Sequence, residues 1–423
     1  MEYLPRLVDT QLDELMSGLP AVAIEGPKAV GKTQTALRRV TTSISLDDDL
    51  ELELARSDPQ RITRLPRPLL IDEWQHLPFV WDRVRHAVDA GVEPGAFLLA
   101  GSAFPQQAPK HSGAGRIVTL RMRPLSLAER GLIAPTVSLA ALLTADTPIA
   151  GESTLTLDDY ATQITSSGLP GLRAIPDALR SQALDGYLDA VVDRDFADAG
   201  HPVRRPGTLR AWLTAYAAAT STTASYTAIL DAATAGLPDK PSRSSIVAYR
   251  EVLERMWLLD ELPAWPGHAN LMSALGQAPK HHLADPALAA RLLGVTAASL
   301  TRSPDPGSVS MRRDGTLLGA LFESLCALCI RVYAQAAHAQ AWHLRTQRGE
   351  HEVDFIVTGQ DGRIVALEAK LAPLPHHDDV RHLTWLRERL GDRLADAIVL
   401  TTGPTAFRRP DGIGVVPLAL LGS

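Results

Sequence analysis

The chain has 423 residues, of which 45% are apolar and 21% are charged, and its formal net charge at pH 7 is −6. This length favours two or three folding units, and the composition is typical of a soluble globular protein. The acidic balance provides no general attraction to nucleic acid, although a local basic groove is compatible with it. The net charge alone therefore does not identify the class of binding partner.

The sequence lacks the patterns of a membrane span and of a secretory signal, and its two cysteines do not form a zinc motif. No run approaches the roughly 18 uninterrupted apolar residues of a membrane span, and Met1–Leu4 lacks the basic-then-apolar order of a secretory signal. We therefore expect a cytoplasmic protein without a membrane partner. Cys326 and Cys329 lie in an apolar run and have no second pair with which to complete a zinc site. We expect them to be small buried hydrophobic residues.

The first section, residues 1–140, alternates short apolar runs with helical stretches. This order predicts an α/β unit built of strand–helix repeats around a sheet. The predicted strands are Ala21–Glu25, Ser43–Leu46, Pro68–Asp72, Ala96–Ala100 and Ile117–Arg121. A stretch rich in Thr and Ala at about 140–156 is interpreted as a linker or a poorly ordered connection. We place the first domain boundary there.

The run from Gly26 to Thr33 follows the pattern G-x-x-x-x-G-K-[ST] between a strand-like segment and the start of a helix. Glycines let the backbone N–H groups face phosphate oxygens, and the helix N-terminus adds partial positive charge. Lys32 is expected to reach the β- and γ-phosphates, and Thr33 to place its hydroxyl on Mg²⁺. The sequence thus predicts an ATP–Mg²⁺ site whose contacts are Gly26, Pro27, Lys28, Ala29, Val30, Gly31, Lys32, Thr33 and Gln34.

An acidic pair follows a second apolar run, Leu69-Leu-Ile-Asp72-Glu73. By itself such a pair is usually a strand end with a solvated turn. Beside a P-loop it is typical of a Walker B strand, in which Asp72 holds Mg²⁺ through water. Glu73 then orients and deprotonates the attacking water.

Two further polar residues are weaker candidates for the nucleotide site. Ser102 follows the apolar run that starts at Phe97, where a side chain can sense the γ-phosphate or hold the water; the alternative is a simple strand cap. Arg116 lies in a glycine-containing loop before the next strand and is a candidate arginine finger or sensor. Most loop arginines have no such role.

The middle section, about 157–290, is mainly helical. Apolar residues at three- and four-residue spacing, from Ile246 to Trp257, predict one helix, and two more are expected near 208–219 and 224–234. A strand at Leu258–Trp265 would give the helix–helix–helix–strand order of a winged helix, with a plain helical adaptor as the alternative. Asp285 before Pro286 predicts an N-cap followed by proline at the first helical position.

The last section, about 310–423, begins with an apolar helix and continues as strands, which predicts a helix followed by a small mixed sheet. Asp354 lies on one predicted strand, and Glu368 and Lys370 share a face of the next, because side chains alternate in strands. Asp354 and Glu368 are expected to bind Mg²⁺ and, with Lys370 and Glu323, to activate water against a phosphodiester. The alternative is an exposed salt bridge, which would contribute only about 0–1 kcal/mol.

These motifs together resemble a bacterial and archaeal family of AAA-like P-loop ATPases that carry a C-terminal domain of uncharacterised function. The resemblance rests on residues 26–33, 69–73, 100–102, 115–116, 122–129, 319–323, 352–355 and 368–370. It implies an AAA+ parallel sheet, a winged-helix-like middle and a C-terminal restriction-endonuclease-like α/β domain similar to the PD-(D/E)xK nucleases. In that domain Glu323, Asp354, Glu368 and Lys370 stand at the motif positions.

The sequence departs from the family pattern at two places. The residue between Glu368 and Lys370 is alanine where the family more often has a β-branched residue, and the run from Lys280 to Asp285 lacks the glycine that usually follows its acid. Neither departure removes a chemical group.

Our leading hypothesis is an ATP-hydrolysing enzyme coupled to a nuclease-like domain that binds or cleaves DNA or RNA. The alternative is a regulatory or remodelling ATPase whose C-terminal domain is an inactive protein-docking module. ATP and Mg²⁺ are the expected cofactors. Because an arginine finger acts on a neighbouring subunit, a homo-oligomer or a partner protein is also considered.

Overall fold

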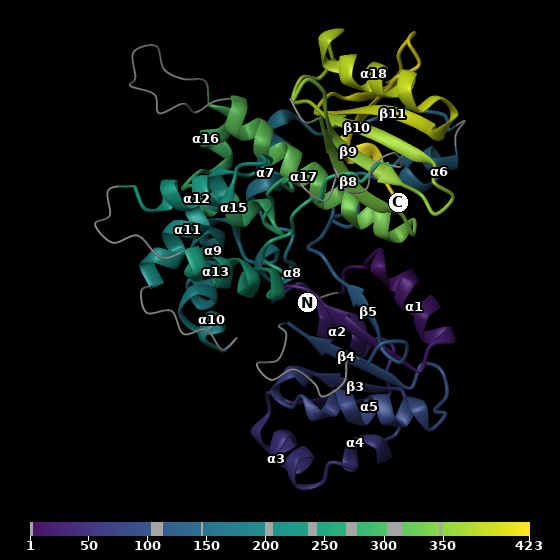
Figure 1. Cartoon of the computed structure of the whole chain (residues 1–423), viewed down its shortest axis with the longest axis vertical. Helices are drawn as coiled ribbons and strands as arrows, with labels where there is room; N and C mark the ends of the chain where they lie inside the picture. Colours follow the sequence, from purple (N-terminus) through teal and green to yellow (C-terminus); the bar gives the residue numbers. More distant parts are fainter. Residues whose placement is uncertain are drawn as a thin grey trace.

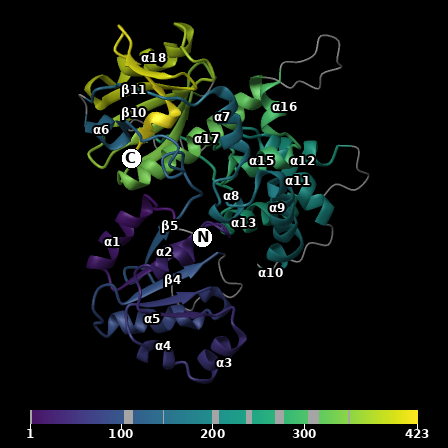
Figure 2. The same ribbon diagram turned by 180° about the vertical axis from the view of Figure 1, so that it is seen from behind.

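The computed structural model describes residues 3–102, 113–144, 147–198, 206–235, 243–267, 277–302, 315–346 and 349–423. Figure 1 shows three parts: the N-terminal sheet unit in purple and blue at the bottom, a helical unit in teal at the left, and a C-terminal sheet unit in green and yellow at the top right. Figure 2 shows the same arrangement from behind, with the helical unit beside both sheet units.

The N-terminal unit is built around a five-stranded parallel sheet of order β2-β3-β4-β1-β5. The strands β1, β3 and β4 are buried along their whole length, as expected when both faces of a parallel sheet are covered. All five predicted strands are confirmed to within one residue at each end. Their bounds are Ala21–Glu25 for β1, Thr42–Ser45 for β2, Leu69–Asp72 for β3, Phe97–Gly101 for β4 and Val118–Arg121 for β5.

Helices surround this sheet. They are α1 (Val8–Gly18), α2 (Lys32–Leu37), α3 (Asp49–Ser57), α4 (Arg61–Arg64), the 3-10 turn η1 (Trp74–His76) and α5 (Phe79–Asp89). Helix α2 begins directly after the P-loop, and η1 begins directly after the Walker B acids. Both therefore start at the carboxyl edge of the sheet, where parallel α/β folds bind their ligands.

The middle unit is helical, as the sequence predicts. It consists of α7 (Leu157–Thr165), α8 (Pro170–Arg173), α9 (Asp177–Ala190), the π-helix η2 (Val191–Asp195), α10 (Phe196–Asp198), α11 (Pro206–Ala218), α12 (Tyr226–Ala233), α13 (Arg243–Arg255), α15 (Pro286–Leu292) and α16 (Ala297–Thr301). The N-cap prediction for Asp285 is confirmed, because its side chain accepts a hydrogen bond from the Ala287 amide at 3.0 Å.

The strand expected at Leu258–Trp265 is present only as isolated bridges. Leu259 pairs with Leu283 and Leu262 pairs with Lys280, both antiparallel, and Ala264 pairs with His343 in the C-terminal unit. The winged-helix interpretation of the middle unit stays a prediction.

The C-terminal unit contains α17 (Gly315–Ala336) and a seven-stranded mixed sheet of order β7-β12-β13-β11-β10-β9-β8. Strand β11 lies at its centre between β13 and β10, and β10 is antiparallel to β9 and parallel to β11. The elements are β8 (Gln340–Arg345), β9 (Glu352–Thr358), β10 (Ile364–Ala369), η3 (Asp378–Val380), α18 (Arg381–Leu390), η4 (Gly391–Arg393), β11 (Leu394–Thr401), β12 (Thr405–Arg408), β13 (Gly414–Pro417), η5 (Leu418–Leu420) and β14 (Leu421–Gly422). The predicted helix and mixed sheet are present; the nuclease-like identity of this unit stays a prediction.

The Thr/Ala-rich stretch is not a free linker. It contains most of α6 (Leu139–Thr144) and β7 (Gly151–Glu152), and β6 (Val137–Ser138) lies directly before it. Strand β6 pairs with β14, and β7 extends the C-terminal sheet beside β12. The buried side chains of Leu139 and Leu142 explain why the segment is anchored. The composition suggested a linker because the few apolar residues that anchor the segment are separated by small polar ones.

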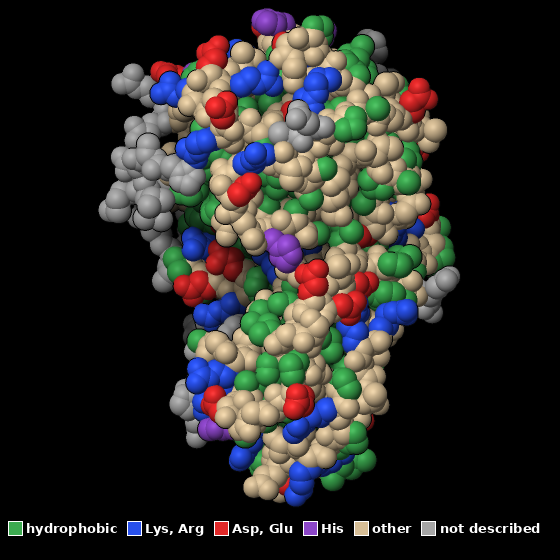
Figure 3. Space-filling model, turned by 90° about the vertical axis from the view of Figure 1, so that its right-hand side faces the viewer, with side chains coloured by type: hydrophobic (Ala, Val, Ile, Leu, Met, Phe, Trp, Pro, Cys, Tyr) green, Lys and Arg blue, Asp and Glu red, His purple; other side chains and the backbone are tan. Residues whose placement is uncertain are grey.

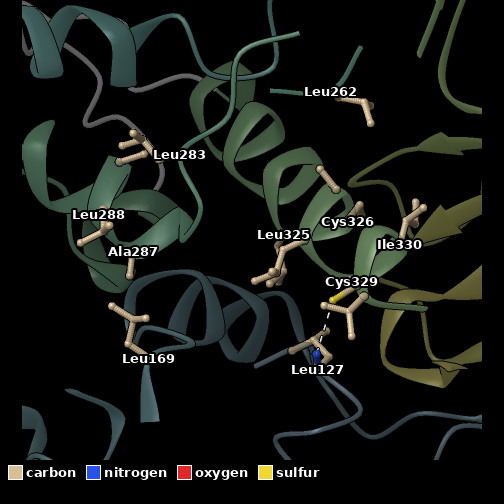
Figure 4. Packing of buried hydrophobic residues seen from close by; sticks show 14 of the residues in the cluster. Leu127, Leu169, Leu262, Leu283, Ala287, Leu288, Leu325, Cys326, Cys329 and Ile330 are labelled. Carbon is tan, nitrogen blue, oxygen red and sulfur yellow. Dashed lines mark hydrogen bonds between the residues drawn. The ribbon is translucent and has the colours of Figure 1, made fainter. Parts of the chain in front are cut away.

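Helix α17 lies at the centre of the largest hydrophobic cluster, which includes Leu325, Cys326, Cys329 and Ile330 (Figure 4). Both cysteines are free and buried, as predicted, and Cys329 Sγ accepts a hydrogen bond from the Leu127 amide at 3.4 Å. Among the described residues one helical segment, Leu317–Ala336, is long and apolar enough to cross a membrane by length and composition, and 67% of its most apolar window is buried inside the protein.

Candidate functional site

The P-loop follows β1 at the carboxyl edge of the parallel sheet and has a tightly constrained backbone. A Cβ atom on Gly26 would lie 2.2 Å from the Met122 carbonyl oxygen, so the position has no room for a side chain. Gly31 has φ +103° and Ala29 has φ +64°, both in the left-handed region. This curled backbone is the conformation that turns successive N–H groups toward an anion.

Lys32 is the buried cation of this loop. Its Nζ donates hydrogen bonds to the carbonyl oxygens of Gly26 and Pro27, each at 2.9 Å, and 6% of the residue is exposed. Burial lowers the pKa of Lys32 to about 8, although the nearby carboxylates of Glu73 and Asp72 raise it. The ammonium is therefore held over the loop, where it can meet phosphate oxygens.

Thr33 and Asp72 are in direct contact, as the Walker A and Walker B interpretation requires. Thr33 Oγ1 donates to Asp72 Oδ2 at 2.8 Å. Asp72 Oδ1 is buried and has no hydrogen-bond partner within the described residues. Burial raises the pKa of Asp72. A hydroxyl beside an unpaired carboxylate oxygen is a suitable donor set for Mg²⁺, a cation that prefers oxygen ligands. The residues present thus fit an ATP–Mg²⁺ site.

Glu73 is positioned by two neighbours. Its backbone has φ +49°, and its Oε2 accepts a hydrogen bond from Ser102 Oγ at 3.2 Å and another from Gln75 Nε2. Ser102 follows β4, the neighbour of β3, and 3% of it is exposed. The structure therefore brings Ser102 to Glu73, and its role in holding the attacking water stays a prediction. Gln75 was missed, because an amide in a short turn carries no sequence signal of its own.

The tip of the P-loop faces the helical unit. Lys28 Nζ forms an ion pair with Asp195 at 2.5 Å, and Tyr187 donates its hydroxyl hydrogen bond to the Lys28 carbonyl at 3.3 Å. Asp195 ends the π-helix η2, a type of helical turn that is often found at functional sites. Gln34, the last predicted nucleotide contact, is exposed in the first turn of α2. Neither Asp195 nor Tyr187 was predicted from the sequence.

Arg116 is not brought to the P-loop of its own chain. Two residues later Val118 pairs with Val22 near the start of β1, so Arg116 lies at the edge of the sheet opposite the P-loop. Its side chain is 48% exposed and forms an ion pair with Asp89 at 2.9 Å. A sensor role within one chain does not fit this position, whereas a role as an arginine finger toward a second subunit stays a prediction.

A buried charge cluster joins the three units. Asp260 of the helical unit contacts Arg121 at 3.0 Å, Arg123 at 2.8 Å and Arg331 at 2.7 Å. Arg121 ends β5 and pairs in register with Glu25, the last residue before the P-loop, and Arg331 belongs to α17. Burial alone would raise the pKa of Asp260, but the three guanidinium groups outweigh it and lower that pKa below its ordinary value.

The four residues predicted for the C-terminal site also converge. Asp354 on β9 accepts a hydrogen bond from the Ala369 amide at 3.0 Å, and Glu368 accepts one from the Asp354 amide at 3.3 Å. Lys370 Nζ lies 3.4 Å from Glu368 Oε1. They border an open cleft of about 390 Å³, whose lining residues are Glu352, Asp354, Glu368, Lys370, Asp378, Asp379, Arg381 and His382. Glu323, on α17, does not line this cleft.

A residue outside the prediction occupies the centre of this group. Lys280 Nζ lies 2.9 Å from Glu323 Oε1, 3.0 Å from Glu352 Oε1 and 2.8 Å from Asp354 Oδ1, and its side chain is 1% exposed. The sequence drew attention to the Lys280 run only as a departure from a family pattern. Nothing in the spacing placed its ammonium beside Glu323 and Asp354, which are 43 and 74 positions away.

These contacts control the charge states of the acids. Burial raises the pKa of Glu323 to about 8, and the charge of Asp354 adds to this effect. Burial also raises the pKa of Glu368 well above its ordinary value. Burial would raise the pKa of Asp354 too, but Lys280 outweighs it and lowers that pKa. Across the described ranges no group of three or more His, Cys, Asp and Glu side chains is placed so that it could hold a metal ion. The predicted Mg²⁺ site of Asp354 and Glu368 stays a prediction.

The chain is similar to known families in three separate segments. Residues 19–130 match a family model described as an AAA domain, residues 157–299 match a domain of unknown function (DUF8612), and residues 318–421 match another domain of unknown function (DUF4143). The N-terminal unit is therefore an AAA-like P-loop domain. The match at the C-terminal unit provides no support for a nuclease.

Relatives and solved structures give the following similarities. Two uncharacterized proteins, Rv2008c of Mycobacterium tuberculosis and Mb2031c of Mycobacterium bovis, are each 26% identical over 415 residues, which cover 94% of this chain and 80% of theirs. A Walker-type ATPase of Pyrococcus abyssi, PABY2304, is 15% identical with a TM-score of 0.41 over 69% of this chain and 96% of that one. The ORC2 protein of Aeropyrum pernix is 15% identical with a TM-score of 0.28 over 61% of this chain and 86% of that one.

Proposed function

We propose that the N-terminal unit binds ATP with Mg²⁺ and hydrolyses it. The observation that carries this proposal is the contact between Thr33 Oγ1 and Asp72 Oδ2 at 2.8 Å, which joins the Walker A and Walker B motifs in one site. Bound Mg²⁺ would neutralise phosphate charge in the transition state. Lys32 would clamp the β- and γ-phosphates, and Glu73, held by Ser102, would orient and deprotonate the attacking water.

Phosphate release by the full chain with Mg²⁺ and ATP tests this proposal. Lys32→Ala should lower turnover by at least about 100-fold, because the charge that the loop presents to the phosphates is lost. Arg56→Ala is the control, since Arg56 is 50% exposed and pairs with Glu53 on the surface of the same unit. Equal turnover in the parent and Lys32→Ala would contradict the site assignment.

We further propose that the nucleotide state acts on the other two units. Lys28 and Asp195 connect the P-loop to the helical unit at 2.5 Å, and Arg121 and Arg331 both contact Asp260. Phosphates at the P-loop would compete with Asp195 for Lys28, because both are anions close to one cation. Loosening of this ion pair is the most direct route by which ATP would change the position of the helical unit.

The second candidate function is a nuclease in the C-terminal unit that acts on DNA or RNA. The observation that favours it is the meeting of Asp354, Glu368 and Lys370 at one open cleft. On the face shown in Figure 3, however, acidic and basic side chains are interspersed, without a continuous basic track. The alternative is a docking module for a partner protein, in which the same residues have no catalytic role.

Cleavage of single- and double-stranded DNA and RNA, with Mg²⁺ or Mn²⁺ and with or without ATP, separates these two possibilities. Cleavage that Asp354→Ala abolishes would establish the nuclease. If no substrate is cut under any condition and ATP is still hydrolysed, the regulatory ATPase with a docking module is favoured. Because the readouts differ, failure of the nuclease leaves the ATPase proposal standing.

A further inference from the structure

We propose that Lys280 is the resident cation of the C-terminal acidic site and that its ammonium closes this site to divalent metal ions. The inference concerns the second candidate function and does not depend on ATP hydrolysis. It rests on the three carboxylates around Lys280 Nζ, on the burial of that group, and on the way the helical unit holds it.

The ammonium stands where a metal ion would need to be. Glu323, Glu352 and Asp354 each place one oxygen at 2.8–3.0 Å from Lys280 Nζ. The remaining oxygen of Asp354 is engaged by the Ala369 amide, so both oxygens of this residue are occupied. A divalent ion would need the same oxygens, and the repulsion between it and the ammonium would be strong in a buried site.

Lys280 is the cation at which these acids meet. Glu323, Glu352 and Asp354 each place an oxygen on its ammonium, and Glu368 lies beside them against the Asp354 amide. Two further cations lie at the margin of the group: Lys370 is 3.4 Å from Glu368, and Arg345 is 3.8 Å from Glu352. Because Lys280 contacts three acids at once and is buried, removing its charge would leave these acids without their shared partner.

Lys280 is supplied by a different unit from the acids. Its backbone is fixed by two hydrogen bonds with Leu262, from Lys280 N to Leu262 O and from Leu262 N to Lys280 O, both at 2.9 Å. The acids belong to α17 and β9 of the C-terminal unit. Opening the site requires the segment that carries Lys280 to separate from β8, because Ala264 pairs with His343 of that strand and the His343 Nε2 atom lies 3.1 Å from the Ala278 carbonyl oxygen.

Binding of Mn²⁺ to the full chain without nucleotide, counted by electron paramagnetic resonance, tests the proposal. Lys280→Met removes the charge and keeps the aliphatic stem; it should bind one Mn²⁺ more than the parent, and Mn²⁺ should raise its thermal midpoint. Adding Asp354→Asn to this variant should remove the extra ion. Lys280→Arg, the matched control, retains the charge and should bind the same number of ions as the parent.

Two results would overturn the proposal. One is a folded Lys280→Met variant that gains no Mn²⁺ site. The other is a parent protein that already binds a Mn²⁺ ion which Glu368→Gln removes. The second measurement needs no change at Lys280, so it decides the question even if Lys280→Met fails to fold because its buried acids lose their partner.

Discussion

Thr33 Oγ1 donates a hydrogen bond to Asp72 Oδ2 across 2.8 Å, and the other oxygen of Asp72 is buried without a partner among the described residues. These two residues are 39 positions apart and belong to different strand–helix connections. Parallel pairing of the strands places them together, because β1 and β3 both flank β4 and all three end at the same edge. The contact leaves one carboxylate oxygen available for a hydrated Mg²⁺ ion.

Asp72→Asn should separate nucleotide binding from metal use. We expect ATP binding in the presence of a chelator to stay within about threefold of the parent, and Mg²⁺-dependent turnover to fall by at least about 100-fold, because the neutral amide no longer holds the cation. Asp58→Asn, at an exposed position paired with Arg64, is the control. Mg²⁺ dependence identical to that of the parent in Asp72→Asn would contradict the Walker B assignment.

Substitution of Arg116 tests whether one subunit supplies an arginine finger to the P-loop of another. If it acts as an arginine finger, Arg116→Ala should lower turnover by about 10³-fold. Mixing Arg116→Ala with Lys32→Ala should then restore part of the activity, because each subunit supplies the residue that the other lacks. Asp89→Ala, which removes the ion-pair partner of Arg116, should have little effect. Full activity of Arg116→Ala would assign this arginine to a surface ion pair only.

The buried side chain of His282 leads us to expect that the folded protein loses stability as the pH falls. Burial lowers the pKa of His282 to about 3, with the charges of Lys280 and Arg331 contributing to this shift and Asp260 opposing it. Both ring nitrogens are buried without a hydrogen-bond partner in the described part of the chain. Between about pH 6.5 and pH 3 the unfolded chain therefore binds one more proton at this residue than the folded chain, so stability decreases as the pH falls, by up to about 1.4 kcal/mol per pH unit.

Thermal unfolding at pH 7 and pH 5 checks this expectation. His282→Leu removes the titrating ring at similar volume and should lose about 2 kcal/mol less than the parent over this interval. His338→Leu is the control, because the side chain of His338 is 49% exposed. If His282→Leu and the parent lose the same stability, His282 is not the source of the acid sensitivity.

The sequence predicted which residues would meet at the P-loop, because their signals are local. Gly26 to Thr33 and Asp72-Glu73 each belong to one short run, and the strand before each run fixes the edge of the sheet at which it ends. The position of Arg116 was harder to predict, since a loop residue has no strand register of its own. The structure shows it at the opposite edge, beside Asp89.

Contacts between units were not predictable from local patterns. Asp195 meets Lys28 from a π-helix, and Lys280 meets Asp354 from an isolated bridge; neither element has a periodicity that a sequence pattern reveals. The acids Asp354 and Glu368 lie side by side as expected, and Glu323 shares the Lys280 ammonium with Asp354. Their cation was missed because it comes from another folding unit and depends on how the units pack.

Glu73→Gln is the most direct test that this chain hydrolyses ATP at its P-loop, because it changes the proposed catalytic base and leaves the phosphate clamp intact. ATP binding should be measured by calorimetry, and phosphate release should be measured in the same preparation. The account predicts parent-like binding with turnover reduced by at least about 100-fold, since Ser102 and Gln75 would hold an amide that cannot accept the proton. Unchanged turnover, or loss of ATP binding, would contradict it.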